Sequence, residues 1–381
     1  MADNNENKVL NVPHLRFPEF SGEWETKSIN DLADVIGGGT PDTTVKSYWD
    51  GGIQWFTPSE IGKNKFVDAS LRTITEDGLN NSSAKLLPPN TILLSSRATI
   101  GECSLSLREC ATNQGFQSLV SKKCNVDFLY YLIQTKKKDL IRKSCGSTFL
   151  EISANEVRKI QVSVPSDVEQ QKIAGLLSLI DKRIATQNKI IEDLKKLKSA
   201  ITDLLFHSIA DAHTIRLGKI AHITNGAGDV QDANTEHQED WYPFFDRSEE
   251  LKWFPTYSFD KEAVIYAGEG QSFYPRYYNG KFALHQRCYA ITDFASCIIP
   301  KYCYHFMNTL NSYFVRNSVG STVPSLRMDI FQKVEIRLPP ISKQQHICKI
   351  IDAFYTKLEV EQRGISILQE LKQFLLSQMF I

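Results

Sequence analysis

The chain has 381 residues, with 44 lysines and arginines against 44 aspartates and glutamates, and an apolar fraction of 42%. This length and apolar content suffice for two ordinary domains and exclude a chain that is disordered over most of its length. A net charge of zero argues against a protein that holds nucleic acid by bulk electrostatics, because such binding scales with the number of phosphates neutralised.

In chain order, the sequence predicts five segments. They are an N-terminal segment (1–23), a mixed domain of short strands and helices (24–165), a long helix (166–208), a second mixed domain (209–340) and a second long helix (341–381). Within the mixed domains, β-rich runs precede helical stretches, at 92–95 before 126–142 and at 263–266 before 299–315. Each domain ends in an alternating run followed by proline, typical of an edge strand, at 160–164 and 334–338.

Two further features bear on the location and chemistry of the chain. No apolar stretch reaches the roughly 18 to 20 residues of a membrane span, and the first 14 residues lack the apolar core of a signal peptide, so we expect a cytoplasmic protein. The eight cysteines form no Cys-x-x-Cys pair and no spacing with histidine that suits zinc. We therefore expect reduced, mostly buried thiols and no metal site.

The second half of the chain repeats the first. Cys145–Thr148 recurs as Val319–Thr322, at an offset of 174 residues. The same offset carries Ile160 to Val334, Pro165 to Pro339, Gln170 to Gln344 and Ile173 to Ile347. Other anchors match at shifted offsets, such as Asn113-Gln114 with His285-Gln286. The matches predict one frame used twice with loops of different length, and such loops are where recognition usually resides.

Both long helices carry an apolar stripe at alternating steps of three and four residues, and the second stripe is the first shifted by 174. Each helix of about 40 residues would be about 60 Å long. A stripe of this length needs a partner. The two helices of one chain can pair as a coiled coil; the alternative is that each packs on its own domain or on another chain.

The chain lacks the motifs of common nucleotide-dependent enzymes. It contains no G-x-x-x-x-G-K-[ST], no strand-bounded G-x-G-x-x-G, and no Asn-Pro-Pro-aromatic or Asp-Pro-Pro-Tyr element of an amino-methyltransferase. Cys145 could act as a nucleophile with His207 or His213, but its repeat partner is Val319, which argues against a catalytic thiol. These observations favour a protein that does not catalyse a reaction alone.

Several segments stand out together: Leu15–Trp24, Gly320–Arg327 with its weaker copy Gly146–Ser153, Leu338–Gln345 with its copy Val164–Gln171, and the long helix after each. In this combination they resemble the specificity subunits of Type I restriction-modification systems. The first copy has Ser153 where the second has Arg327. The resemblance covers nearly the whole chain and implies an α+β fold, in which two pseudo-symmetric mixed α/β target-recognition domains are separated by two long antiparallel helices that form an intramolecular coiled coil.

The resemblance also implies a function and partners. It implies a non-catalytic subunit that recognises double-stranded DNA at a bipartite target and directs two methyltransferase subunits and restriction/translocase subunits to it. S-adenosylmethionine, ATP and magnesium are then expected in the partner subunits, and no cofactor is expected in this chain. The partners are expected to dock on the two long helices, near Gln170, Gln171, Gln344 and Gln345.

Amide, hydroxyl and basic side chains read base edges or hold phosphates. In the first domain such side chains lie in turn-rich stretches, and Trp49 and Trp55 beside them are expected in the core. For each polar residue the alternative is a structural hydrogen bond. A basic cluster at 136–143 could follow the phosphate backbone or face solvent. The predicted DNA contacts are Gln54, Thr57, Ser59, Lys63, Asn64, Lys65, Arg97, Thr99, Asn113, Gln114, Ser147 and Thr148.

In the second domain, basic residues alternate with aromatics and amides over 268–287, which makes this stretch the best single candidate for DNA contact. The alternative is a tyrosine-rich hairpin that packs on itself. The acidic stretch 229–250 is expected to point away from phosphates or toward a basic partner. The predicted contacts are Gln271, Tyr274, Arg276, Tyr277, Lys281, His285, Gln286, Arg287, Ser321, Thr322 and Arg327.

Two other interpretations stay open from the sequence: an interaction scaffold with degenerate recognition domains, and the specificity module of a fused restriction enzyme. If two related domains sit on an antiparallel helix pair, their pseudo-twofold symmetry suits the two half-sites of a duplex. Changing the number of residues within 173–206 is then expected to change the number of unread base pairs between the half-sites.

Overall fold

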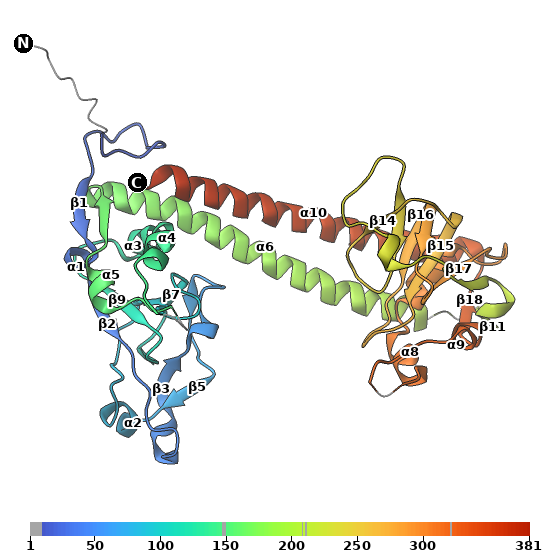
Figure 1. The fold of residues 1–381 in the computed structure, drawn as a ribbon, viewed down its shortest axis with the longest axis horizontal. Helices are drawn as coiled ribbons and strands as arrows, with labels where there is room; N and C mark the ends of the chain where they lie inside the picture. Colours follow the sequence, from blue (N-terminus) through green and yellow to red (C-terminus); the bar gives the residue numbers. More distant parts are fainter. Residues whose placement is uncertain (1–9, 147–149, 208, 210–211, 321) are drawn as a thin grey trace, which may run out of the picture. The chain divides into compact units, whose positions relative to one another are not determined.

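The computed structural model describes residues 10–381 except 147–149, 208, 210–211 and 321. The chain divides into two compact units, residues 1–188 with 363–381, and residues 189–362. Each unit therefore contains one globular domain and part of each long helix (Figure 1).

Unit 1 is built on a five-stranded sheet, a three-stranded sheet and a two-stranded sheet. Its elements are β1 (Glu25–Ser28), α1 (Ile29–Leu32), β2 (Ala33–Gly37), β3 (Trp49–Phe56), β4 (Phe66–Val67), β5 (Arg72–Ile74), α2 (Glu76–Asn80), β6 (Ile92–Leu94), β7 (Cys103–Ser106), β8 (Cys110–Thr112), β9 (Gln117–Ser121), α3 (Val126–Thr135), α4 (Lys137–Arg142), α5 (Ala154–Arg158), β10 (Gln161–Val164), the start of α6 (Asp167–His207) and the end of α10 (Ile341–Met379). The sheet orders are β2-β9-β6-β7-β4, β5-β3-β8 and β1-β10.

Unit 2 has a six-stranded sheet and a two-stranded sheet. Its elements are the end of α6, β11 (His213–Arg216), β12 (His222–Asn225), β13 (Tyr242–Phe245), β14 (Lys252–Phe254), β15 (Phe259–Ala267), β16 (Arg276–Leu284), β17 (Cys288–Thr292), α7 (Pro300–Met307), α8 (Asn311–Asn317), α9 (Met328–Gln332), β18 (Glu335–Leu338) and the start of α10. The sheet orders are β12-β17-β15-β16-β13-β14 and β11-β18.

The repeat seen in the sequence recurs in the sheet topology. The order β2-β9-β6-β7 of unit 1 matches β12-β17-β15-β16 of unit 2. The parallel pair β3–β8 likewise matches the parallel pair β13–β16, so the single strand β16 replaces the two strands β7 and β8. The alternating runs before each proline form β10 and β18 of the two-stranded sheets, as predicted.

The helical stretches expected after the β-rich runs are confirmed, but each is broken in two. α3 and α4 replace the continuous helix expected at 126–142, and α7 and α8 replace the one expected at 299–315. Lys136 caps both α3 and α4, and Leu310 caps α8. The continuous helical periodicity of the sequence did not reveal these breaks.

The two long helices run antiparallel. In unit 1 the start of α6 lies beside the end of α10, where Lys372 Nζ is 2.8 Å from an Asp181 carboxylate oxygen. In unit 2 the end of α6 lies beside the start of α10, where Lys198 Nζ is 4.1 Å from the centre of the Tyr355 ring. The two lysines are related by the 174-residue offset. The predicted intramolecular helix pair is confirmed.

Both helices also pack on the domains, so the two alternatives considered for the apolar stripe occur together. In unit 1, Phe380 stacks on Phe128 of α3, and Ile173 belongs to the same core. In unit 2, Phe206 packs against Tyr302 of α7. Burial of these aromatic side chains ties each domain to its helices.

The cysteines and tryptophans follow the sequence interpretation in most cases. All eight cysteines are free thiols, and five of them are buried, whereas Cys145 and Cys297 are exposed. Trp49 and Trp55 are buried and pack edge to face. Among the described residues, no helix is both long and apolar enough to cross a membrane.

Candidate nucleic-acid interface

The first turn of each long helix is fixed to its own domain by a buried glutamine. Gln170 Oε1 accepts a hydrogen bond from the Asn125 N–H (2.9 Å), and its Nε2 donates to the Pro165 carbonyl (3.0 Å). Gln344 makes the equivalent bonds to the Ile299 N–H (2.9 Å) and the Pro339 carbonyl (2.9 Å).

This arrangement corrects part of the docking prediction. Gln170 and Gln344 are buried with their hydrogen-bonding groups occupied, so they anchor the helices and cannot contact a partner. Gln171 and Gln345 are exposed, and their role in docking stays a prediction.

In each domain, an antiparallel bridge between residues on either side of the Gly-Ser-Thr sequence forms a hairpin junction near the end of a central strand. Cys145 pairs with Glu151, and Val319 pairs with Ser325 at the equivalent position. Gly146 and Gly320 open the two hairpins with φ angles of 136° and 102°, which favour glycine. Of the predicted contacts here, Ser147, Thr148 and Ser321 lie outside the described residues, whereas Thr322 and Arg327 are exposed.

The residue that bridges to each hairpin junction carries opposite charge in the two domains. Arg97 pairs with Glu151 in backbone and side chain, with its guanidinium 2.8 Å from the carboxylate. Glu269, at the equivalent position, pairs in its backbone with Ser325 and holds Arg287 at 2.9 Å. Both arginines are more than two-fifths exposed. An exposed arginine in a surface ion pair exchanges partners at low cost, so both stay available to DNA.

Several predicted contacts in the first domain are instead occupied by structural bonds. Gln54 accepts hydrogen bonds from the Ser70 N–H and hydroxyl. Thr57 shares a capping box with Glu60 and is 3.1 Å from the Ser59 hydroxyl. These side chains hold the turn after β3, and the structural alternative applies to Gln54 and Thr57.

Lys65 also has a structural role. Its ammonium group lies 2.6 Å from Asp127, donates to the Ser178 hydroxyl at 2.7 Å, and is almost fully buried. Since a buried charge separated from its partner costs several kcal/mol (about 3–5), Lys65 stays in place. These bonds favour the structural alternative for Lys65 over a DNA contact.

The remaining polar residues of the first domain reach solvent. Lys63, Asn64, Thr99 and Gln114 are exposed, and Asn113 is half-buried. Thr99 donates its hydroxyl to Ser95, and Asn113 Oδ1 accepts from the Gly115 N–H, so both also shape their own loops.

In the second domain, the hairpin packs partly on itself, as the alternative interpretation held. Arg276 donates to the Ser248 carbonyl and Tyr277 donates to Glu262. Lys281 Nζ lies 4.7 Å from the centre of the Tyr257 ring. Arg276 and Tyr277 are therefore committed to the domain, whereas Lys281 keeps an exposed ammonium group.

The other candidates of the second domain form an exposed set at the loops. Gln271, Tyr274, Gln286 and Arg287 are exposed, and His285 is half-buried with its Nδ1 accepting from the Arg287 N–H (3.2 Å). Asp246 from the acidic stretch is buried and pairs with Lys252 at 2.7 Å. The acidic stretch therefore contributes one structural ion pair.

Sequence reasoning missed a polar contact between each domain and its long helices, which we call the joint of that unit. In unit 1, Tyr131 of α3 donates its hydroxyl to Asp181 of α6 (2.6 Å). Burial and then this bond raise the pKa of Tyr131, so the phenol stays protonated. Burial also raises the pKa of the neighbouring Cys103 thiol to about 12, so it offers no nucleophile.

The joint of unit 2 uses a histidine. His305 Nε2 lies 3.0 Å from an Asp352 carboxylate oxygen, and the His305 ring stacks on Tyr355. Burial lowers the pKa of His305, and its buried Nδ1 has no hydrogen-bond partner within the part of the chain that the structure describes. The 174-residue offset carries Tyr131 to His305, so this offset, applied to polar positions inside helices, could have found both joints.

Comparison with known proteins identifies the family to which this doubled frame belongs. The family model of the Type I restriction modification DNA specificity domain matches residues 21–196 and 210–373, one match for each repeat. The chain belongs to this family. It is a DNA-recognition subunit of a Type I restriction-modification complex.

Curated relatives agree with this assignment, over nearly the whole chain in one case and over about half of it in another. The MjaIX specificity subunit of Methanocaldococcus jannaschii is 28% identical over 407 residues, which cover 94% of this chain and 92% of the relative. The EcoR124I/EcoR124II specificity subunit of Escherichia coli is 30% identical over 190 residues, 48% of this chain and 46% of the relative.

The fold likeness is equally complete. The crystal structure of the S subunit of the Type I restriction-modification system from M. genitalium has a TM-score of 0.63 at 17% identity, and the match covers 97% of this chain and 99% of that one. A chain from a study of complex assembly and conformational transition of the type I R-M system has a TM-score of 0.61 at 15% identity, over 95% of this chain and 98% of that one. These two likenesses concern the fold.

Proposed function

We propose that this specificity subunit reads a bipartite DNA target, one half with each domain, and directs catalytic partners to it without catalysing a reaction itself. The observation that carries the proposal is the doubled frame, with the same strand order and the same hairpin junction in both domains. Two similar readers on one chain suit a target with two separate half-sites.

An equivalent glutamine in each domain is placed to read a base. Gln114 and Gln286 are exposed, and each follows a residue held at the parallel strand pair. The Asn113 N–H donates to the Phe56 carbonyl (3.1 Å), and the His285 N–H donates to the Phe245 carbonyl (2.9 Å). Gln114 Oε1 accepts a hydrogen bond from the Thr40 hydroxyl (2.5 Å), an exposed bond that Gln114 would exchange on binding DNA. A glutamine amide held on such a rigid base can pair with two atoms of an adenine in the major groove.

The test replaces one glutamine at a time. Gln114→Ala and Gln286→Ala are each expressed with the methyltransferase partner, and the methylated motif is mapped across a genome. We expect each variant to relax one or two positions in one half of the motif, since a lost bidentate contact costs about 1–3 kcal/mol of discrimination. Asn80→Ala, a change at the end of α2, is the control. A wild-type motif with one continuous half would contradict the bipartite reading.

The long helices present an apolar surface for the partners. In unit 1, α10 exposes Ile367, Leu371 and Phe374, which share a face at steps of four and three residues. In unit 2, α6 exposes residues at steps of seven, namely Ile190, Leu197 and Leu204. One exposed stripe for each unit supports docking of two copies of one partner, the methyltransferase subunit, through its own helices.

Stoichiometry tests this docking. Leu371→Asp and Leu197→Asp are each expected to leave a complex with one methyltransferase subunit, and the double variant a complex with none, as measured by native mass spectrometry. Ser199→Asp adds the same charge on another face of α6 and is the control. A double variant that still holds two methyltransferase subunits would refute the assignment of the stripes.

In this proposal, the cofactors belong to the partner subunits: S-adenosylmethionine in the methyltransferase, and ATP with magnesium in the restriction/translocase subunits. The proposal is supported by the lack of a nucleotide-binding motif in the sequence of this chain. Equilibrium dialysis with labelled S-adenosylmethionine should show binding to the assembled methyltransferase complex and none to this chain by itself.

A further inference from the structure

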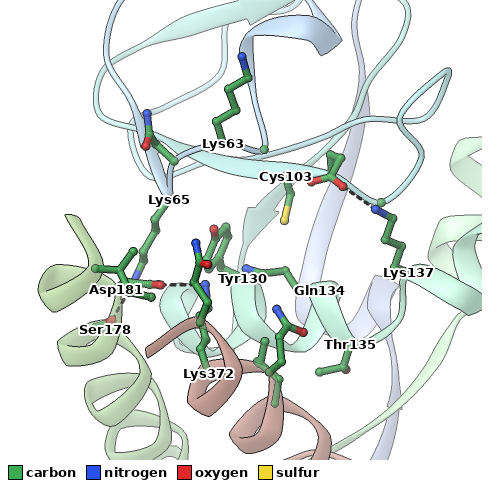
Figure 2. Close-up of a pocket in the computed structure, with 18 of the residues that line it drawn as sticks. Lys63, Lys65, Cys103, Tyr130, Gln134, Thr135, Lys137, Ser178, Asp181 and Lys372 are labelled. Atoms are coloured by element: carbon green, nitrogen blue, oxygen red, sulfur yellow. Dashed lines mark hydrogen bonds and ion pairs between the residues drawn. The ribbon is translucent and has the colours of Figure 1, made fainter. Parts of the chain in front are cut away.

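Unit 1 contains a large open hollow between its domain and the long helices. The hollow has a volume of about 1350 Å³ and is lined by the loops around Asn64 and Glu102, by α3 and α4, and by α6 and α10. Figure 2 shows Lys65, Ser178, Asp181 and Lys372 gathered at one side of the hollow and Lys137 at the other.

The lining of the hollow is positively charged. Six lysines face three acidic residues, and five amide side chains add further donors. The lysines are Lys63, Lys65, Lys137, Lys138, Lys182 and Lys372. For a chain whose net charge is zero, an excess of three positive charges around one hollow is a local concentration that the overall composition conceals.

The acidic residues of the hollow are already paired with three of these lysines. Asp127 pairs with Lys65, Glu102 with Lys137 and Asp181 with Lys372. The other three lysines are exposed, and among the described residues none of them has an ion-pair partner. Lys63 stands at the rim on the domain side (Figure 2). Lys138 lies in the first turn of α4, and Lys182 lies on α6.

The chemistry of the lining favours phosphate groups over a protein partner. Protein interfaces are depleted in lysine and enriched in aromatic residues and methionine, whereas lysine and amide groups are common phosphate contacts in protein–DNA complexes. The hollow also exceeds the roughly 300–1,000 Å³ of pockets that enclose small ligands. A polyanion that passes through an open hollow therefore fits better than a nucleotide.

We propose that this lysine-lined hollow holds the sugar-phosphate backbone of the bound DNA, through Lys63, Lys138 and Lys182. This inference rests on the proposed function. It adds a phosphate-binding site that is independent of base sequence, formed by residues of the first domain and of α6. Because the three lysines make no ion pair with any residue that the structure describes, they can neutralise phosphates without breaking such a contact.

The test compares salt dependence in the complete complex with methyltransferase subunits. Lys63→Ala, Lys138→Ala and Lys182→Ala are combined, and binding is measured between 50 and 200 mM salt on a target duplex and on a duplex with an altered target. A matched triple variant replaces Lys85, Lys123 and Lys343, which are exposed and outside the hollow.

We expect the hollow variant to bind both duplexes more weakly by the same factor. With about 0.9 lost from the salt slope for each phosphate contact, the slope should fall by about 2.7. Between 50 and 200 mM salt, the affinity of the wild type should then fall by a factor about 40 times larger than that of the hollow variant. The matched variant should keep the wild-type slope.

The outcomes separate this inference from the function on which it rests. A wild-type complex that does not distinguish the two duplexes contradicts the proposed function. A wild-type complex that does distinguish them, with an unchanged slope in the hollow variant, overturns the phosphate site alone. Loss of methyltransferase from the hollow variant in native mass spectrometry would also overturn it, because the surface would then serve a protein partner.

Discussion

Replacement of the buried glutamine at the start of each long helix should loosen one unit at a time. Gln170→Ala removes the acceptor for the Asn125 N–H and the donor to the Pro165 carbonyl. Gln344→Ala removes the equivalent pair in unit 2. Gln170→Ala leaves two backbone groups without this partner, and Gln344→Ala leaves three, because Gln344 Nε2 also donates to the Cys297 carbonyl (2.9 Å). In both cases the missing side chain leaves a void.

The size of the effect follows from these bonds. An unsatisfied buried polar group costs about 1–3 kcal/mol, and part of this cost is recovered where water enters. We therefore expect each substitution to lower the free energy of unfolding of its unit by about 2–4 kcal/mol. At about 2–4 °C per kcal/mol for a unit of this size, the melting temperature should fall by about 4–16 °C.

The assay must resolve the two units separately, because unfolding of a chain with two units need not be two-state. Hydrogen exchange read by mass spectrometry meets this need. Gln170→Ala should speed exchange at the start of α3, next to Asn125, and Gln344→Ala should speed it at the start of α7, next to Ile299. Thermal unfolding supplies the overall loss of stability.

The exposed neighbours are the matched controls. Gln171→Ala and Gln345→Ala remove the same side chain one position later, where it reaches solvent. They should leave stability within about 0.5 kcal/mol of the wild type. Equal loss of stability in the buried and exposed variants would refute the anchoring role, as would faster exchange in both units after one substitution.

Three further outcomes follow from the structure. His305 is buried beside Asp352 and its pKa is lowered, so the unfolded chain takes up a proton near pH 6.5 that unit 2 resists. The stability of unit 2 should therefore fall as pH drops below about 6.5. Urea unfolding at pH 5.5 and 7.5 should show that His305→Asn removes this dependence. An equal change of stability with pH in both proteins would count against it. Arg16 binds the buried Glu169 carboxylate with bonds of 2.7 and 2.8 Å. Thermal unfolding should show that Arg16→Met costs about 3–5 kcal/mol of stability, and that a second change, Glu169→Gln, recovers part of this loss. If nothing is recovered, lost packing of Arg16 is the cause. Seven residues inserted at matched points of α6 and α10 lengthen each helix by about 10.5 Å. This should widen the gap in the methylated motif by about three base pairs at 3.4 Å each. A motif with the original gap would contradict the role of the helices as a spacer.

The sequence by itself determined the doubled frame, the class of most of its elements and the two long helices, and it favoured their pairing. Each of these depends on local periodicity or on an offset that can be counted. The apolar stripe needs only residues three and four apart, and the 174-residue offset needs only two copies of one pattern. The same reasoning placed Trp49 and Trp55 in the core, because large aromatics in a strand pattern are usually buried.

Only the tertiary structure decided which polar side chains are free. Gln54 is occupied by Ser70, Lys65 by Ser178 from a helix 113 residues further along the chain, and Arg276 by Ser248. A side chain's hydrogen-bond partner can come from any part of the fold, and no local pattern records it. For the same reason the neutral charge of the whole chain hid a hollow with an excess of lysine, since charges distant in the sequence become neighbours only when the chain folds.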